Sequence, residues 1–228
     1  MSDHGMIISR REMLGNALAL GGLALAHPVG SIFAQEAGRQ ITPSQGMGPF
    51  YPLLKPLDRD ADLTVVRGRQ GRARGQVVHL AGRVLNLKGE PVRGARIELW
   101  QANMHGRYIH PSDPNTGAPL DPNFQGYATQ VTDAEGRYRF RTIKPGPYPS
   151  MYNPGRTRPP HIHFDVAGRD DRLVTQMYFP DEPLNEQDGS FRGLGARQAA
   201  AIGRILPPPK EAEPDVLFMV WDIILPRG

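Results

Sequence analysis

Hydrophobic and polar residues alternate with a period of two over several short stretches from residue 77 onward. Such alternation is typical of β-strands that bury one face, and the Gly, Pro, Asp and Asn residues between the stretches are typical of turns. One stretch, Gly195–Ile205, has an Ala-rich centre of helical composition and is followed by three prolines. The pattern predicts strands at residues 77–85, 95–100, 126–132, 136–142, 161–166, 173–179 and 216–225.

These elements predict a mainly β fold, an antiparallel β-sandwich with at most one or two short helices. The sandwich is expected to occupy residues 76–228. Residues 35–75 are rich in Pro, Gly and charge, and they predict an irregular N-terminal arm that wraps the domain. No glycine fingerprint for a nucleotide is present, because Gly46-x-Gly48 and Gly193-x-Gly195 lack the third glycine and the preceding strand.

The first 34 residues are interpreted as an export signal rather than as part of the fold. Ser9-Arg10-Arg11-Glu12-Met13-Leu14 resembles the twin-arginine signal of bacteria, an apolar run follows, and small residues surround Ala34. The apolar run is too short for a comfortable membrane span, so no membrane association is expected after signal removal. The alternative is an amphipathic or buried N-terminal helix. The first interpretation predicts a periplasmic or otherwise exported protein that acquires its cofactor before export.

Composition narrows the kinds of site that the chain can build. It contains no cysteine, so a metal site must use His, Tyr or carboxylate ligands, and disulfides are excluded. The net charge of +4 is mild, and much of it lies in the run Arg67–Arg74. That run is interpreted as a solvated loop, and no nucleic-acid partner is expected.

The segment Arg158-Pro-Pro-His-Ile-His163 is the sharpest chemical feature. Residues two apart on a strand point to the same face, so His161 and His163 can present both imidazoles to one point. Taken alone, such a motif is weak evidence for a metal site, because it is more often a pair of surface or core histidines on a strand.

Two tyrosines lie in constrained contexts near other polar residues. Tyr108 follows the predicted strand 95–100, and Tyr148 lies in a loop held by three prolines and a glycine. Each tyrosine alone is also explained as a core or rim residue. Two phenolates and two imidazoles together would form a hard, anionic donor set suited to ferric iron, because a bound cation can deprotonate its own ligands.

Six segments together closely resemble the intradiol ring-cleaving dioxygenases, and they follow the order of that family from about Gly46 to Leu225. The segments are Gly48-Pro-Phe-Tyr-Pro52, Glu98-Leu-Trp-Gln-Ala-Asn103, Asp121-Pro-Asn-Phe-Gln-Gly126, Thr132-Asp133 with Gly136, Phe140-Arg-Thr-Ile-Lys-Pro-Gly-Pro-Tyr-Pro149 and Arg158-Pro-Pro-His-Ile-His163.

The resemblance implies a β-sandwich with one non-haem ferric ion, Fe(3+), per chain. It implies Tyr108, Tyr148, His161 and His163 as the iron ligands. Arg158 is implied as the residue that stabilises charge on the bound substrate, Gln176 as a residue near that substrate, and Trp100 as a neighbour of the iron. The implied partners are a small aromatic diol and O₂, and the implied reaction inserts both oxygen atoms. Tyr148 is expected to leave the metal when the diol binds and to accept one of its protons.

Two other functions stay open at this stage. The stretch Lys88–Ala95 also suits a non-catalytic β-sandwich binding module of the transthyretin-like or carbohydrate-binding kind. An iron-binding relative that has lost turnover is the second. Neither the substrate nor the oligomeric state follows from the residues, although the resemblance is compatible with a homo-oligomer.

Overall fold

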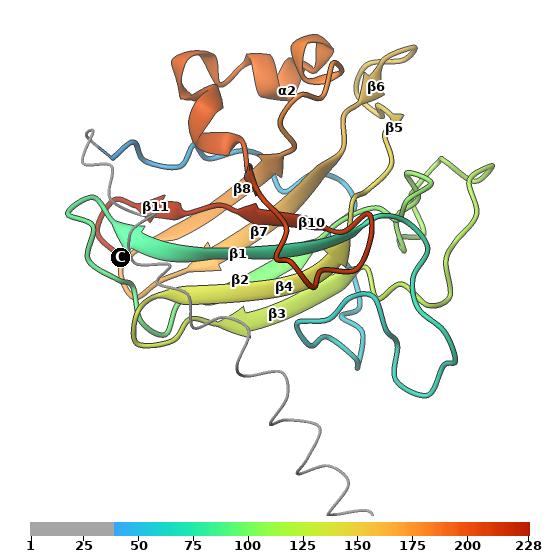
Figure 1. Ribbon diagram of the computed structural model, residues 1–228. Helices are drawn as coiled ribbons and strands as arrows, with labels where there is room; N and C mark the ends of the chain where they lie inside the picture. The colour runs from blue at the N-terminus through green and yellow to red at the C-terminus, as the bar shows by residue number, and fades with distance from the viewer. Residues whose placement is uncertain (1–38) are drawn as a thin grey trace, which may run out of the picture. The chain divides into compact units, whose positions relative to one another are not determined.

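The alternating stretches form two sheets that share one apolar layer (Figure 1). The computed structural model describes residues 39–228, and the predicted export signal lies outside them. The first sheet has the order β11 (Ile223–Leu225), β1 (Val77–Asn86), β10 (Leu217–Val220), β9 (Arg204–Leu206), with β4 (Arg137–Ile143) also paired to β1. The second has the order β3 (Tyr127–Val131), β2 (Arg96–Trp100), β7 (His161–Ala167), β8 (Arg172–Tyr178).

The remaining elements are short. A separate two-stranded hairpin joins β5 (Tyr148–Pro149) to β6 (Thr157–Arg158). After β8 come the 3₁₀ turn η2 (Asn185–Gln187), the single-turn helix α2 (Gly189–Arg192) and the 3₁₀ helix η3 (Gly195–Ala201). Figure 1 shows the segment around α2 and the β5–β6 hairpin on the same side of strands β7 and β8. This mainly β architecture confirms the predicted fold class.

The sandwich differs from the prediction in strand direction. β1 pairs antiparallel with β4 but parallel with both β10 and β11, so the first sheet is mixed. The predicted strand at 216–225 is divided, because the backbone leaves β1 and rejoins it around Trp221 and Asp222. Gly82 permits this close crossing, since a Cβ atom there would lie 1.8 Å from the Trp221 carbonyl oxygen.

The helix predicted at Gly195–Ile205 was wrong over its last four residues. The 3₁₀ helix ends at Ala201, and Arg204–Leu206 instead pairs with β10, with Ile205 opposite Met219. Pairing with an available sheet edge outweighs the weak helical preference of an alanine run, because tertiary context overrides intrinsic propensity.

The described part of the arm, residues 39–75, follows the edges of both sheets without forming a strand of its own. Backbone N–H groups of Thr42, Gln45 and Leu63 donate to carbonyl groups of Ile224, Val174 and Arg141. These bonds hold Gln45 and the following glycines beside the end of β8. Within residues 39–228, none of the helices has the length and apolar character that crossing a membrane requires.

Candidate iron centre

Strand β7 places its residues on two different faces. Ile162, Phe164 and Val166 belong to the apolar layer between the sheets. Because side chains alternate along a strand, His161 and His163 point to the opposite face of the second sheet. Both histidines are buried there, so this face is covered by other parts of the chain.

The register of the second sheet aligns the neighbours of these histidines. His163 lies between Trp100 of β2 and Gln176 of β8, and His161 lies beside Tyr178. The Trp100 ring stacks on the His163 ring, with centroids 4.9 Å apart and planes 9° from parallel. Stacking on one side fixes the plane of the imidazole.

The two tyrosines come from loops that are bonded to each other. Gly146, two residues before Tyr148, donates its backbone N–H to the Asn103 carbonyl at 2.9 Å. The backbone N–H of Tyr108 donates to the Asp113 carboxylate at 2.7 Å. The Tyr108 and Tyr148 rings meet edge to face with centroids 5.3 Å apart. The loops therefore deliver two phenols to one place.

The four side chains converge on one place, and three of them meet through their potential metal-binding atoms. Tyr148 Oη lies 3.2 Å from His161 Nε2, and His161 Nε2 lies 3.2 Å from His163 Nε2. The ring of Tyr108 is within 6.2 Å of the His163 ring, measured between centroids. The structure thus brings together all four residues that the resemblance implied as ligands.

Local bonding prepares the histidines as neutral donors. His161 Nδ1 lies 2.7 Å from the Pro159 carbonyl oxygen, which can only accept, so Nδ1 carries the proton and Nε2 keeps its lone pair. Burial, and then the positive charge of Arg158, hold the pKa of both histidines well below the ordinary value. Both imidazoles are therefore uncharged at neutral pH, the form that binds a metal.

The tyrosines require a cation before they become anionic ligands. Burial raises the pKa of Tyr108 well above its ordinary value, and nearby Tyr148 raises it further. Burial also raises the pKa of Tyr148, although the Arg158 charge opposes this effect. Tyr108 Oη and His163 Nδ1 are buried without a hydrogen-bond partner among residues 39–228. An unpaired buried hydroxyl is costly, and a bound cation would provide its partner.

The donor set fits ferric iron better than the common alternatives. Among the described residues, no three His, Cys, Asp or Glu side chains gather into a metal-binding group, so a metal here depends on the tyrosines. Two imidazoles and two phenols give nitrogen and hard oxygen donors, without the thiolates that favour zinc or copper(I).

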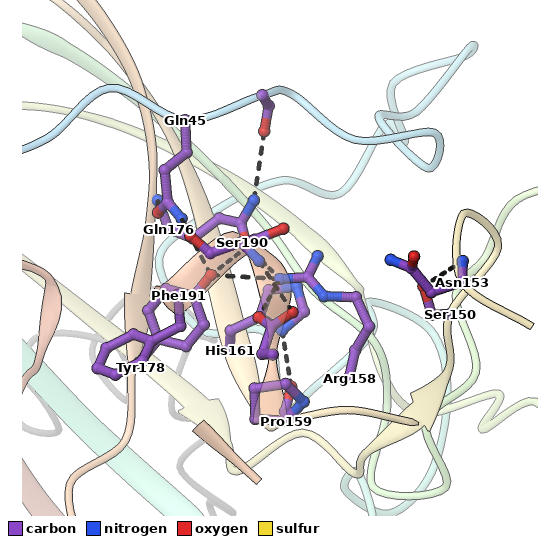
Figure 2. A network of polar contacts seen from close by, with 12 residues as sticks. Gln45, Ser150, Asn153, Arg158, Pro159, His161, Gln176, Tyr178, Ser190 and Phe191 are labelled. Atoms are coloured by element: carbon purple, nitrogen blue, oxygen red, sulfur yellow. Dashed lines mark hydrogen bonds and ion pairs between the residues drawn. The ribbon is translucent and has the colours of Figure 1, made fainter. Parts of the chain in front are cut away.

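Arg158 stands beside this centre in a network of polar contacts (Figure 2). Its Nη2 atom donates to Gln176 Oε1 at 2.9 Å, to Tyr178 Oη at 3.2 Å and to Asp188 Oδ2 at 2.8 Å. Gln45 of the arm donates to Tyr178 Oη at 3.0 Å and accepts from the Gln176 backbone N–H. Arg158 and Gln176, the residues expected near the substrate, therefore lie in direct contact.

A cavity of about 500 Å³ opens next to this network. Tyr148, Arg158 and Gln176 line it, together with Asp188 and Arg197. The volume is within the range of small-molecule sites and exceeds what a single aromatic ring fills. Tyr108 instead borders a separate cavity of about 100 Å³ with Trp100. Of the two tyrosines, Tyr148 is thus the one that faces the larger space.

Sequence reasoning missed three contributors to the site. Gly48 packs against His163, Gln45 connects the arm to Gln176, and Asp188 pairs with Arg158. In the sequence, Gly48 was noted as the first residue of the segment Gly48-Pro-Phe-Tyr-Pro52, without a role at the site. Asp188 carried a local signal, because Asp-Gly-Ser is a helix-start sequence, but nothing linked it to Arg158, 30 residues earlier.

Comparison with known proteins agrees with the site. Residues 47–204 match the sequence model of the family described as Dioxygenase (Dioxygenase_C). The protocatechuate 3,4-dioxygenase β chain of Burkholderia cepacia is 51% identical over 142 residues, covering 61% of this chain and 59% of the relative. Hydroxyquinol 1,2-dioxygenase of Rhodococcus opacus is 30% identical over 192 residues, covering 78% and 59%. The chain belongs to the intradiol dioxygenase family.

Solved structures give the same result. The dioxygenase domain of a dioxygenase–carbohydrate-binding fusion from Streptomyces sp. SirexAA-E superposes with a TM-score of 0.61 at 25% identity, covering 83% of this chain and all of that domain. Catechol 1,2-dioxygenase from Pseudomonas arvilla C-1 gives a TM-score of 0.58 at 27% identity, covering 80% and 61%. The chain spans between 50% and 59% of the length of the curated relatives that it matches first. Family membership favours a dioxygenase over the transthyretin-like or carbohydrate-binding module.

Proposed function

We propose that this protein is an intradiol dioxygenase that opens a catechol-type aromatic ring in the catabolism of aromatic compounds. The ring would break between its two hydroxyl-bearing carbons, and both atoms of one O₂ would enter the product as parts of two carboxyl groups. The observation that carries the proposal is the convergence of Tyr148, His161 and His163. His161 Nε2 lies 3.2 Å from both Tyr148 Oη and His163 Nε2, beside a cavity lined by Arg158 and Gln176.

The four converging side chains, Tyr108, Tyr148, His161 and His163, would hold one ferric ion. Bound there, the ion would supply Lewis acidity and a redox-active centre that activates the diol toward O₂. The neutral imidazoles and the unpaired Tyr108 hydroxyl support this assignment.

Tyr148 would accept a proton from the diol. Its hydroxyl lies at the boundary between the histidines and the cavity, and the Arg158 charge favours its phenolate form. As a phenolate, Tyr148 would be a base within hydrogen-bonding reach of a diol hydroxyl in the cavity. Tyr108 does not line this cavity, so it is assigned a purely ligating role.

Arg158 and Gln176 would bind and orient the ring. Arg158 lines the cavity, so its guanidinium charge would act on a negatively charged ring oxygen bound there. A fixed guanidinium stabilises developing negative charge without reorganising, an effect of a few kcal/mol. The Gln176 amide donates to the Gly46 carbonyl at 3.3 Å, and this contact holds its oxygen toward Arg158.

The substrate is proposed to be a diol that carries an anionic group. Arg158 is neutralised by Asp188, whereas Arg197 lines the same cavity and makes no ion pair within residues 39–228. An arginine near a carboxylate can bind it through two parallel N–H donors. The name of the Burkholderia relative, a protocatechuate dioxygenase, supports the same class of substrate.

Oxygen uptake tests the proposal directly. Purified protein with measured iron would be supplied with catechol, hydroxyquinol and 3,4-dihydroxybenzoate, and ring opening followed by loss of aromatic absorbance. Stoichiometric O₂ uptake with at least one diol supports the function. Iron binding with a tyrosinate-type visible band but without uptake for any diol would instead identify an iron-binding relative that has lost turnover.

Export is proposed from the N-terminal sequence alone. Ser9-Arg10-Arg11 and the apolar run after it are the supporting features. A fusion of residues 1–40 to a reporter that is active only after twin-arginine export would test it. Replacement of Arg10 and Arg11 by lysine should abolish export, and unchanged export would contradict the proposal.

Assembly into a homo-oligomer is proposed from the arm. Leu53, Leu54 and Leu57 are all largely exposed, at 72%, 90% and 105% of the reference area. Clustered exposed apolar side chains are typical of contact surfaces. Light scattering after size-exclusion chromatography would measure the mass, and a strictly monomeric protein at micromolar concentration would contradict this proposal.

A further inference from the structure

Among residues 39–228, Arg158 has one ion-pair partner. Three oxygen atoms surround its Nη2, and those of Gln176 and Tyr178 belong to neutral groups. The third belongs to the Asp188 carboxylate, 2.8 Å away. The side chains of Arg158 and Asp188 are only 12% and 6% exposed. A guanidinium so deeply buried needs a counter-charge to keep its position.

Asp188 is itself held rigidly by its surroundings. Its carboxylate accepts from the Ser190 backbone N–H and begins helix α2. Its own backbone N–H donates to the Asn185 carbonyl at 3.1 Å, and the Asn185 side chain donates to the Phe179 carbonyl at 2.9 Å. Because Phe179 directly follows β8, the carboxylate is fixed relative to the strand that carries Gln176.

The alternative position for a released Arg158 is next to a residue of the proposed chemistry. Arg158 and Tyr148 are cross-strand partners in the β5–β6 hairpin. A guanidinium without Asp188 would be free to move toward the Tyr148 phenolate or toward solvent through the cavity. In either position it would no longer offer a fixed donor to a substrate oxygen.

We propose that Asp188 is a positioning residue that acts through Arg158: it holds the guanidinium in place in the wall of the cavity, where Arg158 would bind the diol. This inference rests on the proposed function. The carboxylate would not contact the iron ligands, so its effect would fall on diol binding and turnover and not on the metal.

The test compares Asp188→Asn with wild type and with Glu186→Gln. Asparagine keeps the size and the helix-capping oxygen but removes the charge. Glu186 is an exposed acidic residue on the neighbouring turn η2, so its neutralisation controls for a general change of charge. Iron content should stay at the wild-type level in both variants. In Asp188→Asn alone, kcat/KM and the affinity for an anaerobic diol should fall by about 10- to 100-fold, the loss typical of a charged hydrogen bond.

A double-mutant cycle with Arg158→Gln separates positioning from a structural role in the cavity wall. If Asp188 acts through Arg158, adding Asp188→Asn to Arg158→Gln should cause little further loss of diol affinity. Fully additive losses would overturn the inference, as would unchanged diol affinity in Asp188→Asn. If Asp188→Asn does not fold, two other variants replace it: the double variant Arg158→Gln/Asp188→Asn, which buries no unpaired charge, and Asp188→Glu. Asp188→Glu should retain more diol affinity than Arg158→Gln. Equal losses of diol affinity in these two variants would overturn the inference.

The result for the wild-type protein distinguishes failure of the proposed function from failure of the proposed role of Asp188. Wild-type protein that binds iron but neither binds nor consumes any diol would refute the proposed function and this inference with it. Wild-type turnover together with an unaffected Asp188→Asn variant would refute the inference alone.

Discussion

A Cβ atom at Gly48 would lie 3.1 Å from Cε1 and 3.7 Å from Nε2 of His163. Gly48 has a φ of +77°, a conformation that other residues adopt only with strain. The arm therefore packs its backbone directly against the edge of an imidazole whose face is covered by Trp100. Glycine at the edge and tryptophan on the face together fix the ring.

Gly48→Ala should lower iron occupancy because the added methyl pushes the His163 ring away from its position. Backbone strain alone would cost about 1–2 kcal/mol of stability. The matched control is Gly68→Ala, since Gly68 has a φ of +79° with no atom near an added Cβ. Iron per chain after dialysis is the measurement. Equal iron occupancy in both variants would show that His163 does not depend on Gly48.

His161→Asn should remove the metal and the visible colour. Loss of one imidazole leaves three ligands. Mutation of residues that only orient a metal ligand typically reduces metal affinity by about 10- to 100-fold, so removal of a ligand itself should reduce it further. His79→Asn on β1 serves as the control because His79 lies in the other sheet, stacked on Phe218. Iron would be quantified by atomic absorption. A His161→Asn protein with full iron content would contradict the ligand assignment.

The second sheet illustrates what sequence patterns can predict. Alternation in residues 161–166 predicted that His161 and His163 share one face of the strand, and in the structure Ile162 and Phe164 lie on the other face, in the apolar layer. Tyr108 lies in a loop and Tyr148 in the two-residue strand β5, and no periodicity connects either to that face. Only their resemblance to a family motif associated them with the histidines before the structure did.

Other features depended on contacts that no local pattern encodes. Pairing of Arg204–Leu206 with β10 followed from a free sheet edge, and it ended the predicted helix early. The parallel pairing of β1 with β10 and β11 joins segments about 140 residues apart. Asp188 meets Arg158 because η2 and α2 fold back over β8, an arrangement set by packing of Phe191 on Tyr178.

Tyr148→Phe and Tyr108→Phe should have different consequences. Both remove a phenol from the converging set, but only Tyr148 lines the larger cavity. Tyr148→Phe should reduce kcat by about 10²- to 10⁴-fold through loss of the proton acceptor while retaining part of the iron. Tyr108→Phe should chiefly reduce iron content. Turnover rates expressed per bound iron separate the two effects, and identical rates per iron would argue against a proton-accepting Tyr148.

Arg197→Gln should change substrate preference and leave turnover of uncharged diols intact. The side chain lines the cavity without an ion pair among residues 39–228, so its charge is available to an anionic substituent. Losing one charged hydrogen-bonding group should lower kcat/KM for 3,4-dihydroxybenzoate relative to 4-methylcatechol by about 10-fold or more. Arg192→Gln in α2 is the control, since Arg192 does not line this cavity. An unchanged preference in Arg197→Gln would remove the basis for an anionic substrate.

Tyr138 links stability to alkaline pH. Its hydroxyl donates to the Trp221 carbonyl at 2.6 Å, where the chain crosses between β10 and β11. Tyr138→Phe leaves that buried carbonyl unpaired and should lower the free energy of unfolding by about 1–3 kcal/mol at neutral pH.

Burial raises the pKa of Tyr138 well above its ordinary value, and the Asp222 charge raises it further. The unfolded chain releases this proton near the ordinary value of about 10, whereas the folded chain retains it. Stability due to the neutral phenol is therefore fully present below pH ~10 and declines by about 1.4 kcal/mol per pH unit above it. The stability difference between wild type and Tyr138→Phe should consequently shrink as pH rises from about 9 to 11. Urea unfolding followed by tryptophan fluorescence measures the difference, and two curves that stay parallel across this range would show that the Tyr138 phenol is not kept neutral by the fold.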